Sequence, residues 1–337
     1  MRYIGQYLNE FYRLKRKGRC LHYGAGKRCN AIINAHSIQR SRALSRIASD
    51  GEVYRINADF STLQKNMGKL LMKKYGIKNV STFLGFCKHH DNELFEPIDN
   101  YPLIPNDQQV FLYSYRSLCR ELFVKENAYN LYSTQLNSVP VEYKWLIHSL
   151  KEGNEHGFKN LLRHKKIFDN SLVNKNYEHI RYVVFMSDSE PNIFFSSLLY
   201  PDFDFMGQQL QDLANLGETL ELITFCSVPM DTGWGFLFAW HKSSSNICMH
   251  YMRSLSTAVH NKNNISDFLF RLVFSTSENH AILPTWWDNL STENKEHILE
   301  RLNSLADVTE PVIHSYLEKG LDGISGWSFQ KVISKME

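Results

Sequence analysis

Three cysteines and one histidine near the N-terminus constrain this chain more than any other feature. Cys20 and Cys29 form one close pair, and Cys87 and His90 form a second pair in the compact Cys-x-x-His spacing. A structural zinc site takes four such ligands at tetrahedral positions, usually as two pairs from separate turns. The first pair is spaced more widely than the usual gap of about two to four residues, but two glycines let its loop fold back. The sequence therefore predicts a zinc-binding module with these four ligands.

Cysteine use and hydropathy indicate the cellular compartment of the protein. Six cysteines in 337 residues are too few for a disulfide scaffold, and Cys119, Cys226 and Cys248 lie in apolar stretches typical of buried thiols. No apolar run approaches the roughly 20 residues needed to cross a bilayer. Basic residues also stand where a signal peptide would have its apolar core. We expect a cytoplasmic protein with no membrane partner.

Charge is distributed unevenly along the chain. Residues 1–99 hold 18 Lys and Arg against 8 Asp and Glu, a balance of +10, whereas the remainder has a balance of −7. A basic region favours a polyanionic partner, most commonly nucleic acid, although a basic surface can also serve solubility alone. Phosphate-binding and dinucleotide-binding glycine motifs are absent from the sequence, as is the serine-hydrolase elbow, so these three functions have no support.

The hydrophobic pattern predicts an α+β protein with three regions. These are a basic zinc-binding module over residues 1–100, a helical connector over 106–170, and a mainly antiparallel sheet with C-terminal helices over 177–337. Three prolines within 96–107 mark the first boundary.

Individual elements follow from periodicity and turn signals. Helices are expected over residues 1–16, 61–75, 107–123, 141–168 and 291–305, with Asp107 and Ser291 as N-caps. Strands are expected over residues 51–57, 179–186, 192–200, 219–228 and 233–240.

Two short segments, together with Cys20 and Cys29, carry a resemblance to a known family. The segments AHSIQ (35–39) and CKHHDN (87–92) resemble the HNH, or ββα-metal, group of treble-clef nucleases, over about the first 98 residues. In that group a cysteine pair precedes a strand that carries the catalytic histidine, and a later turn closes the zinc site and starts a metal-binding helix. The chain as a whole, with its GQQLQDL, GFLFAW and WWDNL segments, is also similar to a group of bacterial proteins without an assigned activity.

The resemblance to HNH nucleases implies roles for particular residues. His36 would be the general base that activates water, Asp91 would be a ligand of a catalytic Mg or Mn ion, and Asn92 would orient a loop or join the metal shell. Such chemistry suits these side chains, because a neutral histidine accepts a proton at cytoplasmic pH and a carboxylate holds a divalent ion that polarises a phosphate.

Nearby basic residues are candidates for holding the phosphate backbone. Arg40 and Arg42 follow the AHSIQ segment closely and suit bidentate contacts with phosphate. Lys69 and Lys73 lie on the basic helix expected over 61–75 and join them as nucleic-acid-binding candidates.

Two functions remain open from the sequence. The first is a metal-dependent nuclease, with a role in bacterial defence by analogy with other HNH proteins. The second is a non-catalytic zinc-stabilised module that binds nucleic acid or protein as a sensor or adaptor, with 177–337 as the candidate protein-binding region. Residues 37–48 also fit a helix with Ile38, Leu44 and Ile47 directed inward, which would make His36 a structural residue at its N-terminus.

Overall fold

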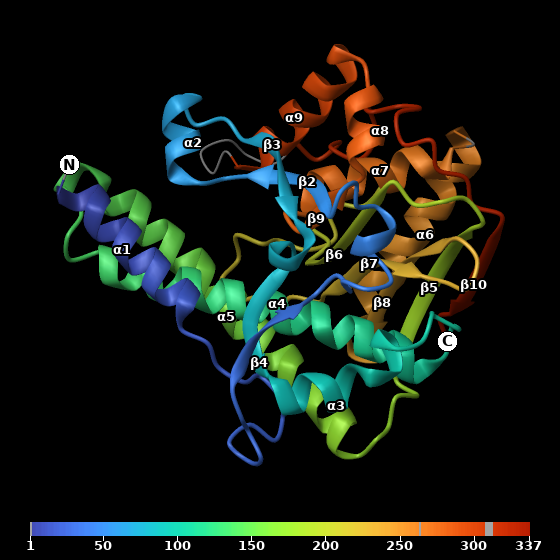
Figure 1. Ribbon diagram of the computed structural model, residues 1–337, viewed down its shortest axis with the longest axis horizontal. Coiled ribbons are helices and arrows are strands. Elements are labelled where there is room, and N and C mark those ends of the chain that lie inside the picture. Colours follow the sequence, from blue (N-terminus) through green and yellow to red (C-terminus); the bar gives the residue numbers. More distant parts are fainter. Residues whose placement is uncertain (1, 263, 307–312) are drawn as a thin grey trace.

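An eight-stranded antiparallel sheet forms the centre of the structure, a computed structural model that describes residues 2–262, 264–306 and 313–337 (Figure 1). The strand order is β10-β5-β8-β7-β6-β9-β2-β3. The strands are β2 (Glu52–Asn57), β3 (Leu71–Gly76), β5 (Ile180–Ser187), β6 (Ile193–Leu199), β7 (Ile223–Pro229), β8 (Trp234–His241), β9 (His280–Ile282) and β10 (Lys331–Lys335). The α+β class and the antiparallel pairing are therefore confirmed.

Helices cover both faces of this sheet, which explains why its central strands read as continuous apolar runs. On one face Phe185, Phe225 and Phe236 pack against α6 (Ser245–Lys262), α7 (Ile265–Thr276) and α9 (Thr292–Ala306). On the other face Val184 and Leu237 pack against α4 (Asp107–Gln135) and α5 (Lys144–Val173). Alternate residues of each strand thus enter two separate cores.

The remaining elements agree with the predicted pattern in most places. α1 begins at Arg2 and ends at Arg16, whereas Met1 lies outside the described residues. The Ser291 hydroxyl accepts a hydrogen bond from Asn294 N at 3.1 Å, so the predicted cap of α9 is confirmed. The short elements are α2 (Phe60–Lys65), α8 (Pro284–Asn289), η1 (Leu44–Arg46), η2 (Ile77–Asn79), η3 (Val141–Tyr143) and η4 (Lys242–Ser244).

The N-cap of α4 was assigned to the wrong residue. Asn106, and not Asp107, has the extended backbone of a cap, and its side chain accepts from Gln109 N at 2.9 Å. Asp107 instead occupies the first helical position, where its carboxylate accepts a hydrogen bond from Lys335 Nζ at 2.6 Å. Asn and Asp are equally good caps, so the preference between neighbours depends on this tertiary contact.

The predicted helix over residues 61–75 is wrong. α2 ends at Lys65 because Met67 and Gly68 adopt left-handed backbone angles, with φ of 52° and 84°. The chain then continues as β3, which pairs residue by residue with β2 from Asn57↔Leu71 to Glu52↔Gly76. Pairing with β2 overrides the local helical pattern. Lys69 consequently lies in a turn and Lys73 on the edge strand.

The region expected to be the N-terminal module contributes to the large sheet. β2 pairs with β9 through Tyr54↔Ile282, and the Tyr54 hydroxyl donates to Asp288 Oδ1 at 2.9 Å. Asn303 of α9 also accepts from Leu70 N at 2.7 Å. The division at residue 100 stays a prediction, but residues 52–76 share a sheet with the C-terminal region. Within the described parts of the chain, no helix has both the length and the apolarity needed to span a membrane.

Two buried histidines make stability sensitive to acid. His280 Nδ1 donates to Ser277 O at 3.0 Å while its Nε2 is buried without a partner, and His164 is likewise bonded through one ring nitrogen. Burial lowers the pKa of each to about 4. The unfolded chain, with a histidine pKa of about 6.5, therefore binds protons first as the pH falls, and stability is lost between about pH 6.5 and 4.

We expect each of these histidines to lower the free energy of unfolding by about 2 kcal/mol when the pH falls from 7.5 to 5. Urea unfolding of His280→Gln at both pH values should show a smaller pH-dependent difference than the parent chain. His148→Gln, at an exposed position of α5, should keep the parent's difference. Equal pH dependence in all three proteins would contradict the assignment.

Candidate metal centre

Two antiparallel strands and a helix build the centre. We call the strand pair the metal-centre hairpin, although its two strands are not consecutive in the chain. β1 (Ile32–His36) pairs antiparallel with β4 (Thr82–Cys87), and α3 (Lys88–Asp99) follows β4 directly. The start of the helix is tied to the hairpin because Lys88 N donates to Ala31 O at 2.9 Å and His89 N donates to Asn30 Oδ1 at 3.0 Å. These bonds satisfy backbone donors that the first helical turn leaves free.

The four predicted zinc ligands come together at this junction. His90 Nδ1 lies 3.4 Å from Cys20 Sγ, 3.5 Å from Cys29 Sγ and 3.3 Å from Cys87 Sγ, and all four donor atoms lie within 4.8 Å of one another. A zinc tetrahedron with Zn–S of about 2.3 Å and Zn–N of about 2.05 Å has sulfur–nitrogen edges of about 3.5 Å. The donor set therefore fits zinc, and the Cys3His cluster predicted from the sequence is confirmed as a cluster that could hold it.

The loop between Cys20 and Cys29 folds back in spite of its length. Gly26 has a φ of 90°, which favours glycine, and its N–H donates to Cys29 Sγ at 3.3 Å. Leu21 N donates to Gly85 O at 2.8 Å, so the loop lies against β4. The long spacing of the first pair is thus absorbed by a glycine turn held on the hairpin.

The surroundings of the cluster suit a closed structural site. Cys87 and His90 are buried, and the His22 ring stacks on the His90 ring with centroids 4.0 Å apart. Four protein donors leave no position for substrate, whereas catalytic zinc sites keep one open. Among the described residues, no second group of three His, Cys, Asp or Glu side chains is gathered in this way.

His36 lies at the end of β1, as the resemblance implies. Its Nε2 donates to Ile77 O at 3.2 Å. Burial lowers the pKa of His36, the Ile77 carbonyl opposes that effect, and Arg40 lowers the pKa further. His36 is therefore a neutral imidazole at pH 7. The alternative helix over 37–48 is wrong, because this segment forms turns and the short η1, although Ile38 and Leu44 are buried as expected.

Asp91 lies in the first turn of α3, partly buried, and Asn92 beside it is exposed. Burial raises the pKa of Asp91 to about 6, with opposing effects of Arg116 and Asp99. The same two charges act on the pKa of His36. His36 and Asp91 thus share charged neighbours, but no hydrogen bond joins them in the described structure.

A buried ion pair beside these residues was not anticipated. Arg116 of α4 is 3% exposed and donates from both terminal nitrogens to the Asp99 carboxylate, each at 2.8 Å. Its guanidinium lies 4.0 Å from the centroid of the Phe95 ring, and Gln39 Nε2 donates to Asp99 O. Arg116 Nε and Gln39 Oε1 are buried without described partners. The signal in the sequence is an arginine inside the apolar run of α4.

The predicted nucleic-acid-binding residues do not form one group. Arg40 is exposed close to His36, whereas the Arg42 guanidinium donates to Asn100 O at 2.6 Å. Lys69 and Lys73 are exposed on the turn and the strand of the β2–β3 hairpin. No protein-family model, curated protein or solved structure matches the chain.

Proposed function

We propose that the protein is a metal-dependent nuclease with an HNH-like, treble-clef N-terminal unit. One observation carries the proposal: His36 ends the first strand of a zinc-ligand hairpin whose second strand leads directly into the helix that bears Asp91. This order of cysteine loop, strand, strand and helix is what the HNH resemblance implies. Cytoplasmic location remains an expectation from the sequence pattern, and a role in bacterial defence remains one from that resemblance.

Each residue has a chemical role in this proposal. His36 accepts a proton from water, because its half-buried imidazole is neutral at pH 7. Asp91 would hold Mg or Mn, for which one or two carboxylates together with phosphate oxygens suffice. A divalent ion held there would polarise the scissile phosphate and stabilise the leaving oxygen. Arg40, exposed beside His36, would contact a phosphate.

A second function is a non-catalytic module that binds nucleic acid or protein. The observation that favours it is the bond from His36 Nε2 to Ile77 O, which gives His36 a structural role in joining β1 to η2. In this alternative the zinc cluster organises a surface, and residues 177–337 offer the protein partner's site.

A cleavage assay separates the two functions. Purified protein is incubated with plasmid or RNA and Mg²⁺ or Mn²⁺, and we expect His36→Ala and Asp91→Asn to lose about 100-fold or more in rate. Glu93→Gln, an exposed change on the same helix, is the matched control and should cleave normally. Zinc content is measured for every variant, so that loss of the scaffold is not mistaken for loss of catalysis.

Cleavage that survives in His36→Ala would contradict the assigned base. No cleavage of any substrate by the parent chain, combined with retained nucleic-acid binding, would favour the binding module.

A further inference from the structure

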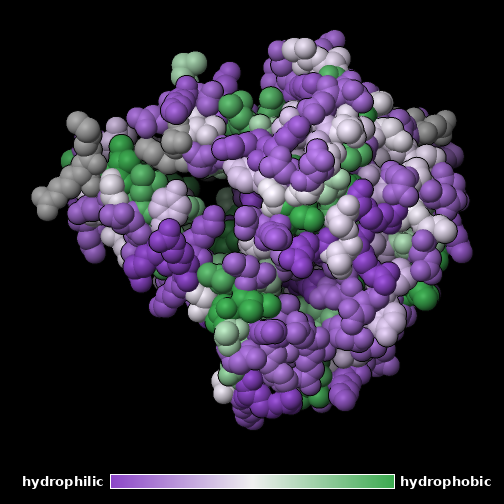
Figure 2. Space-filling model, in the orientation of Figure 1, coloured by the Kyte–Doolittle hydropathy of each residue, from purple (hydrophilic) through white to green (hydrophobic). Residues whose placement is uncertain are grey.

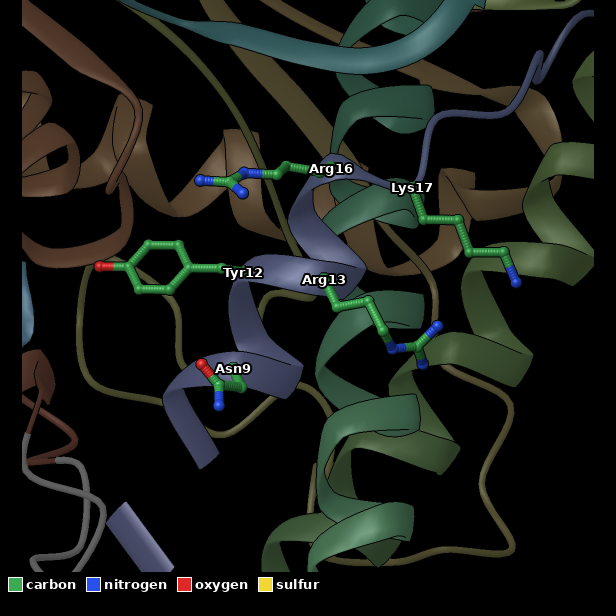
Figure 3. Close-up of a pocket in the computed structure, with 5 residues that line it drawn as sticks. All are labelled: Asn9, Tyr12, Arg13, Arg16 and Lys17. Atoms are coloured by element: carbon green, nitrogen blue, oxygen red, sulfur yellow. The ribbon is translucent and has the colours of Figure 1, made fainter. Parts of the chain in front are cut away.

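α1 and the β2–β3 hairpin flank a hollow at the surface, visible between the two parts in Figure 2. Four cations lie on the elements that border this region, which we call the basic hollow: Lys15 and Arg16 of α1, Arg55 of β2 and Lys73 of β3. α1 itself borders a concave surface lined by Tyr12, Arg16 and its neighbours (Figure 3). Like charges gathered in one place repel one another, so their placement needs a physical reason.

The cations on the hairpin are placed against one another. Arg55 and Lys73 are direct partners in the β2–β3 register, so their side chains project from the same face of the sheet. Like charges in opposing positions destabilise a strand pair. The pKa of Lys15 is lowered by burial and by the charge of Arg55, which brings the end of α1 into the same field. An anion in the hollow would relieve this repulsion.

Carboxylates pair with two neighbouring cations but with none of these four. Lys74 points to the opposite face and lies 3.4 Å from Asp288, and Arg13 of α1 lies 2.6 Å from Glu10. In the described structure Lys15, Arg16, Arg55 and Lys73 form no ion pair. Burial and the charge of Arg120 lower the pKa of Arg55, and Tyr75 and exposed Glu278 oppose that effect. The hollow thus keeps unpaired positive charge.

Aromatic rings lie beside the unpaired cations. The Tyr75 ring has Arg55 at 5.5 Å and Lys73 at 5.8 Å from its centroid, and the Tyr12 ring has Arg16 at 6.0 Å. Tyr12 and Arg16 extend from one side of α1, away from Arg13 and Lys17 (Figure 3). Cations that track a backbone and rings on which bases stack are the combination that binds single-stranded nucleic acid.

The strand that borders the hollow continues into the residue that contacts the candidate catalytic histidine. β3 carries Lys73 and Tyr75 and ends at Gly76, and the next residue, Ile77, accepts the hydrogen bond from His36 Nε2. We propose that the basic hollow binds single-stranded nucleic acid, with Lys15, Arg16, Arg55 and Lys73 on its phosphates and Tyr12 and Tyr75 on its bases, and presents it to His36. This inference rests on the proposed nuclease function and names its substrate class.

Binding without divalent ions tests the hollow separately from cleavage. Fluorescence anisotropy is measured with a labelled single-stranded DNA or RNA of about 16 nucleotides. We expect the double variant Arg16→Gln/Lys73→Gln to bind at least about tenfold more weakly, and the slope of log affinity against log salt to fall by about 1.4. Lys74→Gln/Lys159→Gln removes the same charge at two carboxylate-paired positions, on the opposite face of β3 and on α5, and is the matched control, expected to bind as the parent does.

The outcomes are distinguishable. Equal weakening in both double variants, or equal affinity for duplex DNA of the same length, would overturn the hollow as a single-strand site. Unimpaired binding and cleavage in Arg16→Gln/Lys73→Gln would also overturn it, because lysine on an edge strand then serves only to prevent strand addition. Selective loss of binding in that variant supports the hollow even if the parent cleaves nothing, in which case the nuclease proposal fails alone.

Discussion

His90→Ala is expected to lose its zinc and to unfold much of the N-terminal region, whereas His89→Ala is expected to keep both. His90 Nδ1 is the common neighbour of the three thiolate positions, and the four ligands join a loop, a hairpin and a helix. Zinc binding to such sites is worth about 10 kcal/mol or more in isolated zinc modules, whereas here Phe83, Phe86 and Phe95 also pack into a core with α4. We expect a loss of at least about 4 kcal/mol in unfolding free energy, since tertiary contacts of α3 and α4 remain.

The measurement combines metal analysis with urea unfolding. The parent chain should contain about one equivalent of zinc, as should His89→Ala, whose altered side chain is the neighbouring histidine on the same helix. Cys87→Ser should behave as His90→Ala does. Less than half an equivalent in the freshly purified parent, or zinc retained in His90→Ala, would refute the site.

Arg116→Met is expected to destabilise the protein by about 3 kcal/mol, at the lower end of the range for one partner removed from a buried ion pair. Its guanidinium is buried, bidentate on Asp99 and stacked on Phe95, so the change leaves the Asp99 carboxylate without its cation. The Asp99 side chain is 33% exposed, and water therefore limits the loss.

Arg120→Met, one turn further along α4, is the control. Arg120 forms a partly buried pair with its chain neighbour Glu121, both side chains still reach solvent, and we expect its loss to cost about 1 kcal/mol. Chemical unfolding is measured for Arg116→Met, Arg120→Met, Asp99→Asn and the double variant Arg116→Met/Asp99→Asn. The cycle of Arg116→Met, Asp99→Asn and their combination gives the coupling energy of the ion pair. A loss in Arg116→Met no larger than in Arg120→Met would show that Phe95 and its neighbours repack without the ion pair.

What could be predicted from the sequence depended on how local the chemistry is. The four zinc ligands were found because cysteine and histidine are rare and metal spacing is short-range, and the strands β5 to β8 were found because their apolar runs are long. The helix over 61–75 failed because its outcome depended on pairing with β2 and on left-handed angles at Met67 and Gly68. Hydrophobic periodicity indicates neither the strand pairing nor the left-handed angles.

Contacts between distant segments were out of reach for the same reason. Arg116 and Asp99 lie on different helices, and the sequence does not show that they are in contact. Its one hint is a charged residue among apolar neighbours. Lys73 was anticipated as a nucleic-acid contact, but on a helix. Its partner Arg55, and the distinction between Lys73 and Lys74, follow only from the strand register.

The two strands of the metal-centre hairpin are neighbours in space but not in sequence, and this has a consequence for how the molecule assembles. Between His36 and Thr82 the chain leaves the hairpin, supplies β2 and β3 to the large sheet, and returns. Closing β1 on β4 therefore closes a long loop of chain, which makes the pairing an entropically costly step of folding. A fragment that ends at residue 100 would retain every metal ligand yet leave β2 without β9. Truncation at that point should yield a chain that captures metal but exposes an open strand edge, and is therefore prone to self-association.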